Sequence, residues 1–206
     1  EIIARALKNE GLDTIFLLIG DHILPVADTL GDSDFRLIDT RHEQAAVHMA
    51  EAWGRLTGGP SVAMYTTPGF ANAIPGLASA WHSESPVLSI SGSAELSELG
   101  RGAMQEIDQV NMARPITKGS WMVTDPRRIP DMIARALRLA MSGRRGPVHL
   151  TIPVDLQERE VPEDEVRFFS PQEYRGIGAV QAEPAEVREA LDLLHSAKRP
   201  LIIAGS

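Results

Sequence analysis

The sequence predicts an α/β fold, with a doubly wound, mostly parallel sheet that has helices on both faces. Short apolar runs rich in Ile, Val and Leu alternate with helical stretches along residues 1–157. This alternation is typical of strand–helix–strand units and therefore of a parallel sheet. The apolar runs are continuous instead of alternating with polar residues, which indicates strands that are covered on both sides.

The expected elements follow one another in a regular order, after a chain start at Glu1 that already has helical spacing. Strands are expected at Thr14–Ile19, Phe35–Ile38, Ser61–Tyr65, Pro86–Ile90 and Pro147–Ile152. Helices are expected at His22–Leu30, at Glu43–Leu56, within Phe70–His82 and at Arg127–Met141. Glycines follow two of these helices, at Gly31 and at Gly58–Gly59, where glycine favours a helix end.

The organisation changes after residue 157. Residues 158–182 are charged, lack a clear period and contain Pro, Gly and aromatic residues, so we interpret them as a linker on the surface. Residues 183–206 hold a predicted helix at Glu183–Ala197 and a predicted strand at Pro200–Ala204. A single strand without a partner is not stable, so we expect residues 183–206 to begin a further, truncated domain of a longer polypeptide.

Composition excludes several classes of protein. The 206 residues carry a net charge of −8, which argues against nucleic acid as the main partner because phosphate binding needs a basic face. The absence of cysteine excludes a disulfide scaffold and a thiolate nucleophile. The sequence has neither an apolar run long enough for a membrane span nor a recognisable signal peptide, so no membrane partner is expected and a cytoplasmic location is the default.

Familiar ligand motifs are also missing. The sequence lacks G-x-G-x-x-G, a P-loop and a G-x-S-x-G nucleophile elbow. His42 and His48 do not have the spacing of a helical zinc pair, and no cysteine could complete such a site. No metal site is therefore predicted in this chain.

Polar residues and glycines follow several predicted strands. In a doubly wound sheet, ligands bind outside the carboxyl ends of the strands, so these segments meet at one edge. They are Gly20–His22, Asp39–Glu43, Thr66–Asn72 and, in a long loop, Met104–Gln109. Three of them have an ordinary structural explanation as well: Glu43 suits the first turn of a helix, Thr66–Asn72 suits a capped loop, and His22 suits a helix N-terminus facing water.

Four ordered segments resemble the amino-terminal, pyrimidine-binding domain of thiamine-diphosphate-dependent enzymes such as acetolactate synthase and benzaldehyde lyase. They are IDTRHEQAAVHMAEAWGRLTG, TTPGFANAIPGLASAWHSESPVLSISG, IDQVNMARPITKGSW and RGPVHLTIPVDLQ. The resemblance spans Glu1 to Gln157, and the run RPLIIAGS resembles the opening of the central domain of that family.

The resemblance implies a role for each candidate residue. It matches Glu43 to the catalytic glutamate that hydrogen-bonds the N1′ atom of the cofactor pyrimidine and so activates the cofactor. The other implied residues bind the cofactor (Thr67, Pro68, Gly69 and Asn72) or line the substrate pocket (Gly20, Asp21, His22, Phe70 and Gln105). Two residues depart from the pattern: Thr67 replaces a glycine, and Pro75 lies inside the helix that should follow, where it removes one backbone hydrogen bond.

The resemblance also implies what this chain lacks. In the family, a carboxy-terminal domain with a G-D-G motif and a downstream Asn holds the diphosphate and Mg²⁺. Gly31–Ser33 matches that motif in part, but the next asparagine is Asn72, which is too far along the chain. The two halves of the site come from different subunits, so a second copy of the full-length chain is the expected partner, beside a small-molecule substrate. Binding of FAD by the central domain is left open.

The implied function is that of a carboligase, lyase or decarboxylase acting on 2-keto acids or 2-hydroxy ketones. Acetolactate synthase-like chemistry is the family default, whereas His22 and Phe70 favour a benzaldehyde lyase-like enzyme, and oxalyl-coenzyme A decarboxylase-like activity is a further alternative. A non-catalytic binding or regulatory module with the same fold is an alternative from another class, against which the presence of Glu43 argues. A natural two-chain enzyme is another, against which the strand predicted after Pro200 argues.

Overall fold

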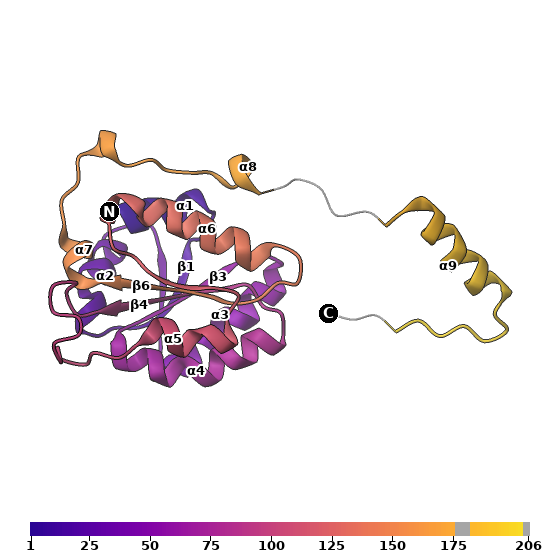
Figure 1. The fold of residues 1–206 in the computed structure, drawn as a ribbon, viewed down its shortest axis with the longest axis horizontal. Coiled ribbons are helices and arrows are strands. Elements are labelled where there is room, and N and C mark those ends of the chain that lie inside the picture. Colours follow the sequence, from indigo (N-terminus) through magenta and orange to yellow (C-terminus); the bar gives the residue numbers. More distant parts are fainter. Residues whose placement is uncertain (176–181, 204–206) are drawn as a thin grey trace. The chain divides into compact units, whose positions relative to one another are not determined.

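The computed structural model describes residues 1–175 and 182–203. The chain divides into two compact units, Glu1–Tyr174 and Arg175–Ser206. The first unit contains a six-stranded sheet with the strand order β2-β1-β3-β4-β6-β5 (Figure 1). The strands are β1 (Thr14–Leu18), β2 (Arg36–Asp39), β3 (Ser61–Tyr65), β4 (Val87–Ser93), β5 (Ser120–Met122) and β6 (Val148–Pro153). Each neighbouring pair is parallel, so the predicted α/β class is confirmed and the sheet is parallel throughout.

Helices precede, connect and follow these strands. The described helices are α1 (Ile2–Asn9), α2 (Leu24–Gly31), α3 (Glu43–Thr57), α4 (Thr67–His82), α5 (Gln109–Ala113), α6 (Ile129–Met141), α7 (Val154–Glu158), α8 (Pro171–Tyr174) and α9 (Pro184–Ser196). Short 3-10 turns at Asp21–Ile23, Arg114–Ile116, Pro126–Arg128 and Glu163–Glu165 complete the described elements.

Two apolar cores lie on opposite faces of the sheet (Figure 1). One face packs against α1, α2 and α6, with Leu7, Leu30 and Ile133 among its buried side chains. The other face packs against α3 and α4, where Val47 and Leu77 are fully buried. Successive residues of a strand point to opposite faces, so the continuous apolar strands serve both cores, as the sequence predicted.

Some elements differ from the sequence prediction. The strand β5 was missed because it is short, lies at the edge of the sheet and has half-buried side chains throughout. Helix α4 begins at Thr67, three residues before the predicted Phe70, with Pro68 in its first turn, where proline is well tolerated. It also continues through Pro75.

The predicted strand at Pro200–Ala204 is wrong where it can be checked. Residues 200–203 form no strand, and Ala204 lies outside the described residues. An extended run becomes a strand only when another strand accepts and donates its backbone hydrogen bonds. Among the described residues of the second unit, the helix α9 is the one element of regular secondary structure. It exposes apolar side chains such as Val187, Leu191 and Leu194.

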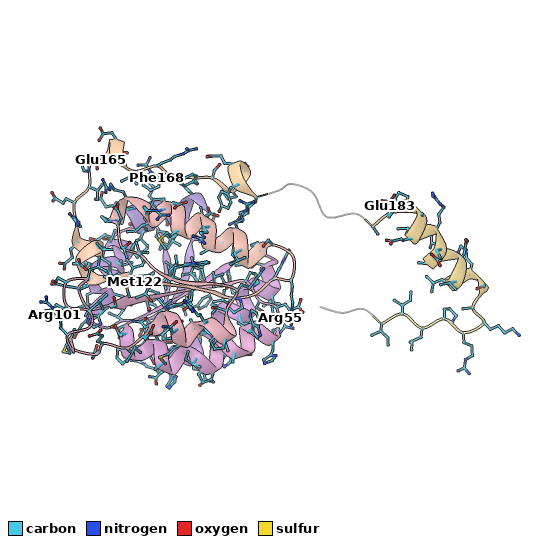
Figure 2. All side chains as sticks on the ribbon, in the orientation of Figure 1. Arg55, Arg101, Met122, Glu165, Phe168 and Glu183 are labelled. Atoms are coloured by element: carbon cyan, nitrogen blue, oxygen red, sulfur yellow. The ribbon has the colours of Figure 1, made fainter. Side chains whose placement is uncertain are left out.

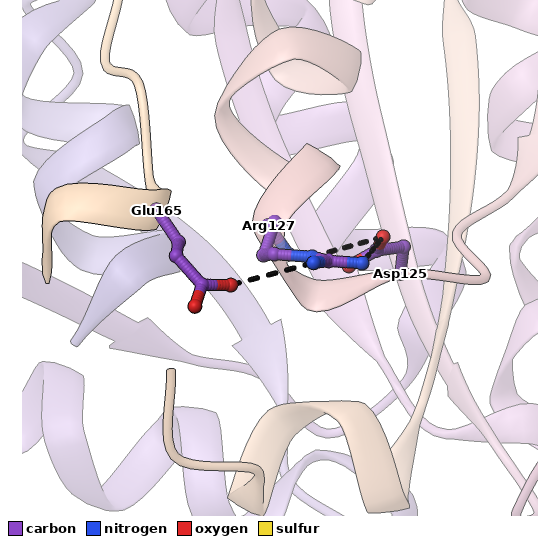
Figure 3. Close-up of polar contacts among 3 residues, drawn as sticks. All are labelled: Asp125, Arg127 and Glu165. Carbon is purple, nitrogen blue, oxygen red and sulfur yellow. Dashed lines mark hydrogen bonds and ion pairs between the residues drawn. The ribbon is translucent and has the colours of Figure 1, made fainter. Parts of the chain in front are cut away.

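The segment after α7 follows the surface of the first unit as far as Tyr174. Arg5 pairs with Glu163 at 2.6 Å, and its guanidinium lies 4.1 Å from the ring centroid of Phe168, a residue labelled in Figure 2. Arg127 bridges Asp125 at 2.7 Å and Glu165 at 3.3 Å (Figure 3). Residues 158–174 therefore have specific attachments, while the proposed boundaries 1–157, 158–182 and 183–206 stay predictions.

Different segments lie at the carboxyl and amino ends of the strands. The loop with Arg101 follows the carboxyl end of β4, whereas Arg55 lies in the last turn of α3, which leads back to the amino end of β3 (Figure 2).

None of the helices within residues 1–175 and 182–203 combines the length and the apolar character needed to cross a bilayer.

Candidate cofactor-binding site

Glu43 is the first residue of α3 and lies just beyond the carboxyl end of β2. The helix is capped by His42, whose Nδ1 accepts a hydrogen bond from the Gln44 amide at 3.2 Å. The approach to the helix is fixed by Thr40, whose amide donates to the Leu17 carbonyl at 2.9 Å. These bonds hold the start of α3 at the edge of the sheet where ligands bind in doubly wound folds.

The Glu43 side chain is buried, with 7% of its surface exposed. Its Oε2 accepts a hydrogen bond from Asn72 Nδ2 at 3.0 Å. A buried carboxylate is costly unless polar groups satisfy it, and the Asn72 amide from the next helix supplies one such group. Glu43 and Asn72, which are 29 positions apart, are thereby joined in one polar site.

Gly69 lets the two helices approach each other at this point. A β-carbon built on Gly69 would stand 2.8 Å from Cγ and 2.9 Å from Cδ of Glu43, closer than side chains normally pack. Gly69 is in the first turn of α4, so the Glu43 carboxylate lies near the positive end of that helix dipole. A second close approach lies further along α3 and α4, where a β-carbon built on Gly76 would stand 2.7 Å from Cβ of Val47.

His22 lies in the 3-10 turn after β1 and is also buried. Its Nδ1 is 2.7 Å from Thr67 Oγ1, and the Thr67 hydroxyl donates to the Gly92 carbonyl at 3.1 Å. Since the hydroxyl has one proton, the His22 ring is the donor to Thr67. Burial lowers the pKa of His22, an effect that the neighbouring Asp21 charge opposes, so the ring favours its neutral form.

Gln105 lies in the long loop between β4 and α5, is exposed, and has a left-handed backbone with φ 63°. The adjacent Glu106 organises this loop, because its carboxylate accepts backbone bonds from Gly100 at 2.6 Å and from Gly102 and Ala103 at 3.2 Å each. These bonds, first of all the one from Gly100, lower the pKa of Glu106. The loop around Gln105 thus has an internal structure of its own.

The predicted site residues other than Phe70 fall into three groups. Glu43, Gly69 and Asn72 are in direct contact, and His22 joins Thr67 beside them. Gly20 packs on Thr66, where a β-carbon would stand 2.6 Å from Cγ2. Asp21, Pro68 and Gln105 are exposed.

Phe70 has no exposed surface, and its ring lies 4.4 Å from the ring of His149 and 6.3 Å from that of Tyr65. The structure therefore gives Phe70 a place in the core, and its role in a substrate pocket stays a prediction.

The sequence did not reveal a set of buried polar residues on β3, β4 and β6 and at the start of α5. Tyr65, Ser89, Ser91, Gln109 and His149 are each at most 2% exposed and hydrogen-bonded to one another. The only signal in the sequence is the alternation of serines in β4, together with a histidine inside the apolar strand β6.

The fold and this geometry define a class: an α/β domain that presents a buried carboxylate, across a glycine contact, at the ligand-binding edge of its sheet. Residues 1–112 match the family model described as "Thiamine pyrophosphate enzyme, N-terminal TPP binding domain". The chain therefore belongs to the thiamine pyrophosphate (thiamine diphosphate) enzyme family and contains the N-terminal domain of that family.

Curated relatives agree with this assignment over the whole chain. It is 36% identical over 207 residues to the probable acetolactate synthase large subunit of Methanocaldococcus jannaschii, covering 100% of this chain and 35% of that protein. It is 35% identical over 207 residues to the oxalyl-CoA decarboxylase of Escherichia coli, covering 99% of this chain and 37% of that protein. It is 34% identical over 212 residues to the Escherichia coli acetolactate synthase isozyme 3 large subunit, covering 100% of this chain and 36% of that protein. The chain thus spans little more than a third of the length of these relatives.

Within the described part of the chain, no three or more His, Asp or Glu side chains gather in an arrangement suited to a metal ion.

Proposed function

We propose that this chain is the pyrimidine-binding domain of a thiamine-diphosphate-dependent enzyme that makes or breaks C–C bonds in 2-keto acids or 2-hydroxy ketones, with acetolactate synthase-like activity. The observation that carries this proposal is the contact of the buried Glu43 carboxylate with Gly69 and Asn72. In this proposal Glu43 is the catalytic residue, and Pro68, Gly69 and Asn72 surround the cofactor pyrimidine.

The geometry around Glu43 fits an aromatic nitrogen base. Asn72 holds Oε2 and the glycine contact fixes the direction of the carboxyl group, so the side chain is preorganised instead of free to rotate. Thiamine diphosphate, when bound, supplies the electron sink for the reaction. The part of Glu43 is to hold a proton at the ring nitrogen of the pyrimidine, which an Asp would reach poorly because it is shorter by one methylene.

A second candidate activity is decarboxylation of an oxalyl-coenzyme A-like substrate. It is favoured by the oxalyl-CoA decarboxylase relative, whose 35% identity is close to the 36% of the acetolactate synthase relative. Benzaldehyde lyase-like carboligation is a further candidate, suggested by His22 and Phe70. These activities share Glu43 and differ in the substrate that the complete protein accepts.

The remaining parts of the site are proposed to come from outside this chain. We propose that Mg²⁺ and the diphosphate are held by a carboxy-terminal domain of a second copy of the full-length protein. The family resemblance leaves open whether the central domain binds FAD. A cytoplasmic location stays a prediction.

The proposed role of Glu43 is tested by exchange of the C2 proton of bound thiamine diphosphate, followed by NMR in the full-length protein. Glu43→Gln is expected to slow exchange by at least about 100-fold, the usual scale of a lost acid–base group. Glu51→Gln is the matched control, because Glu51 lies on the same helix and is equally buried, at 7% exposed, but bonds to Ser79 instead. Unchanged exchange in Glu43→Gln would remove Glu43 as the activator.

The substrate is tested separately. The full-length protein is assayed for acetolactate formation from pyruvate and for decarboxylation of oxalyl-coenzyme A, with and without added cofactor. Turnover of pyruvate but not of oxalyl-coenzyme A supports the first activity. Turnover of oxalyl-coenzyme A but not of pyruvate supports the second. Activity that does not depend on thiamine diphosphate contradicts both.

A further inference from the structure

A continuous chain of buried polar groups lies between the sheet and the helices on the face that carries α4. It consists of Tyr65 on β3, Ser89 and Ser91 on β4, His149 on β6 and Gln109 at the start of α5. Tyr65, Ser89, Ser91 and His149 have no exposed surface, and Gln109 is 2% exposed. Burying a polar group without a hydrogen-bond partner costs free energy, so a network of this kind is stable when its members bond to one another.

The bonds form one path. The Tyr65 hydroxyl contacts Ser89 Oγ, which is 2.9 Å from Nδ1 of His149. The other ring nitrogen of His149 is 3.0 Å from Thr151 Oγ1 and 3.4 Å from Ser91 Oγ. Ser91 donates to Oε1 of Gln109, and the Gln109 amide donates to the Gly92 carbonyl at 2.9 Å.

The protons on this path can be placed. Burial lowers the pKa of His149 to about 3, so the ring is neutral and has one N–H and one acceptor nitrogen. Since the Ser91 proton is used at Gln109, the contact between Ser91 Oγ and Nε2 of His149 is a hydrogen bond in the tautomer with its proton on Nε2, which also faces Thr151 Oγ1 at 3.0 Å. In this tautomer Nδ1 accepts from Ser89, Ser89 accepts from Tyr65, and the donors follow one direction from Tyr65 to Gly92.

The path ends at the candidate site. The Gly92 carbonyl accepts from the Gln109 amide at 2.9 Å and from the Thr67 hydroxyl at 3.1 Å. Thr67 is the first residue of α4, and Gly69, two residues later, packs on Glu43. A second contact reaches the same turn, since the Phe70 ring lies 4.4 Å from the His149 ring.

We propose that the hydrogen bonds from His149 through Ser91 and Gln109 to Gly92 hold the first turn of α4 in place, which makes Ser91 and Gln109 positioning residues for the contact between Gly69 and Glu43. The inference rests on the proposed function for its meaning in cofactor binding, but the positioning of α4 can be measured without the cofactor. Gln109 orients the Gly92 carbonyl, and that carbonyl anchors Thr67.

The test compares Ser91→Ala with Ser61→Ala in the full-length protein. Both serines are buried in neighbouring strands, but Ser61 Oγ has no hydrogen-bond partner among the described residues and lies at the amino end of β3, away from the site. The first readout is amide hydrogen exchange of residues 67–72 without cofactor. Ser91→Ala is expected to speed this exchange, whereas Ser61→Ala leaves it at the wild-type rate.

The second readout is binding of thiamine diphosphate at saturating Mg²⁺. Ser91→Ala is expected to raise the dissociation constant about tenfold, the change expected for one lost hydrogen bond, while turnover at saturating cofactor stays within about twofold of the wild type. A merely structural residue would lower the thermal midpoint without this separation of affinity from turnover.

Gln109→Met provides a second variant should the alanine disturb the sheet, because Gln109 lies on a short helix outside the sheet and methionine keeps its length. If both variants keep wild-type exchange in residues 67–72 and wild-type cofactor affinity, the inference is overturned. If the wild-type protein binds no thiamine diphosphate, the proposed function fails, and the exchange measurement alone still decides the positioning of α4.

Discussion

Gly92 packs so closely on the backbone of His22 that a β-carbon does not fit between them. A β-carbon built on Gly92 would stand 2.7 Å from Cβ of His22 and would overlap with its carbonyl group. The same glycine carbonyl accepts the Thr67 hydroxyl, which in turn contacts the His22 ring. A missing side chain on β4 thus allows the turn after β1 to reach the start of α4.

The first prediction is that Gly92→Ala is strongly destabilising, by at least about 3 kcal/mol, because the clash is with backbone atoms that have no free rotation. Chemical denaturation of the variant and the wild type measures the difference. Gly31→Ala is the control, since a β-carbon there meets no atom of residues 1–175 and 182–203 within 4 Å. That change, inside α2, is expected to be neutral or stabilising by up to about 1 kcal/mol. Equal stability of the two variants would show that the close approach of Gly92 to His22 is not as described.

The second prediction concerns Gly69→Ala, where the clash is with the Glu43 side chain instead of the backbone. A side chain can rotate away, so the thermal midpoint should change little while the carboxyl group is displaced from its position. Titration of the full-length protein with thiamine diphosphate should show a loss of affinity of about tenfold or more. Gly31→Ala again serves as the control and should keep the wild-type affinity. An unchanged affinity in Gly69→Ala would mean that the displaced carboxyl group does not take part in cofactor binding.

The contrast between Glu43 and His149 shows what sequence patterns reveal. Strand–helix alternation predicted the sheet, and with it the placement of Glu43 and Pro68–Asn72 at one edge, because each follows a strand in a parallel sheet. The contact between Glu43 and Gly69 has that simple origin. His149, by contrast, lies in an apolar strand like any core residue, and its hydrogen-bond partners come from β4 and β6. Such a network depends on strand order and register, which a local pattern does not contain.

The same reasoning explains the errors at the edges. The strand β5 is three residues long and half-buried, so its sequence has too little apolar periodicity to be recognised. The start of α4 was placed late because Thr67, Pro68 and Gly69 are common in loops, whereas the structure uses Pro68 in the first helical turn.

The third prediction concerns the loop that carries Gln105. In Glu106→Gln, one of the two oxygens becomes an NH₂ group, which faces the amide of Gly100 or those of Gly102 and Ala103 instead of accepting from them. Amide hydrogen exchange in residues 100–103 should therefore become faster in this variant. Glu98→Gln, an exposed change in the same loop, should leave the exchange as it is. Wild-type protection in Glu106→Gln would mean that the carboxylate does not order the loop.

The last prediction concerns pH and stability. Burial lowers the pKa of His149 to about 3 in the folded chain, whereas an exposed histidine titrates near 6.5. Below that upper value the unfolded state binds a proton that the folded state does not, so stability must fall as the pH falls. A histidine that stays neutral in the fold contributes a loss of about 1.4 kcal/mol between about pH 7.5 and pH 5.5. His22, whose pKa is also lowered by burial, adds to the effect in the same direction.

Chemical denaturation at these two pH values measures the loss. Asp108 and Asp125, whose pKa values are lowered by hydrogen bonds, lose their contribution only at more acidic pH, so this window isolates the histidines. His149→Gln keeps a donor and an acceptor but cannot titrate, and it should reduce the pH dependence by the share that belongs to His149. If the wild-type protein is equally stable at both pH values, the neutral state assigned to His149 is wrong. The order of hydrogen-bond donors from Tyr65 to Gly92, which depends on that state, is then wrong as well.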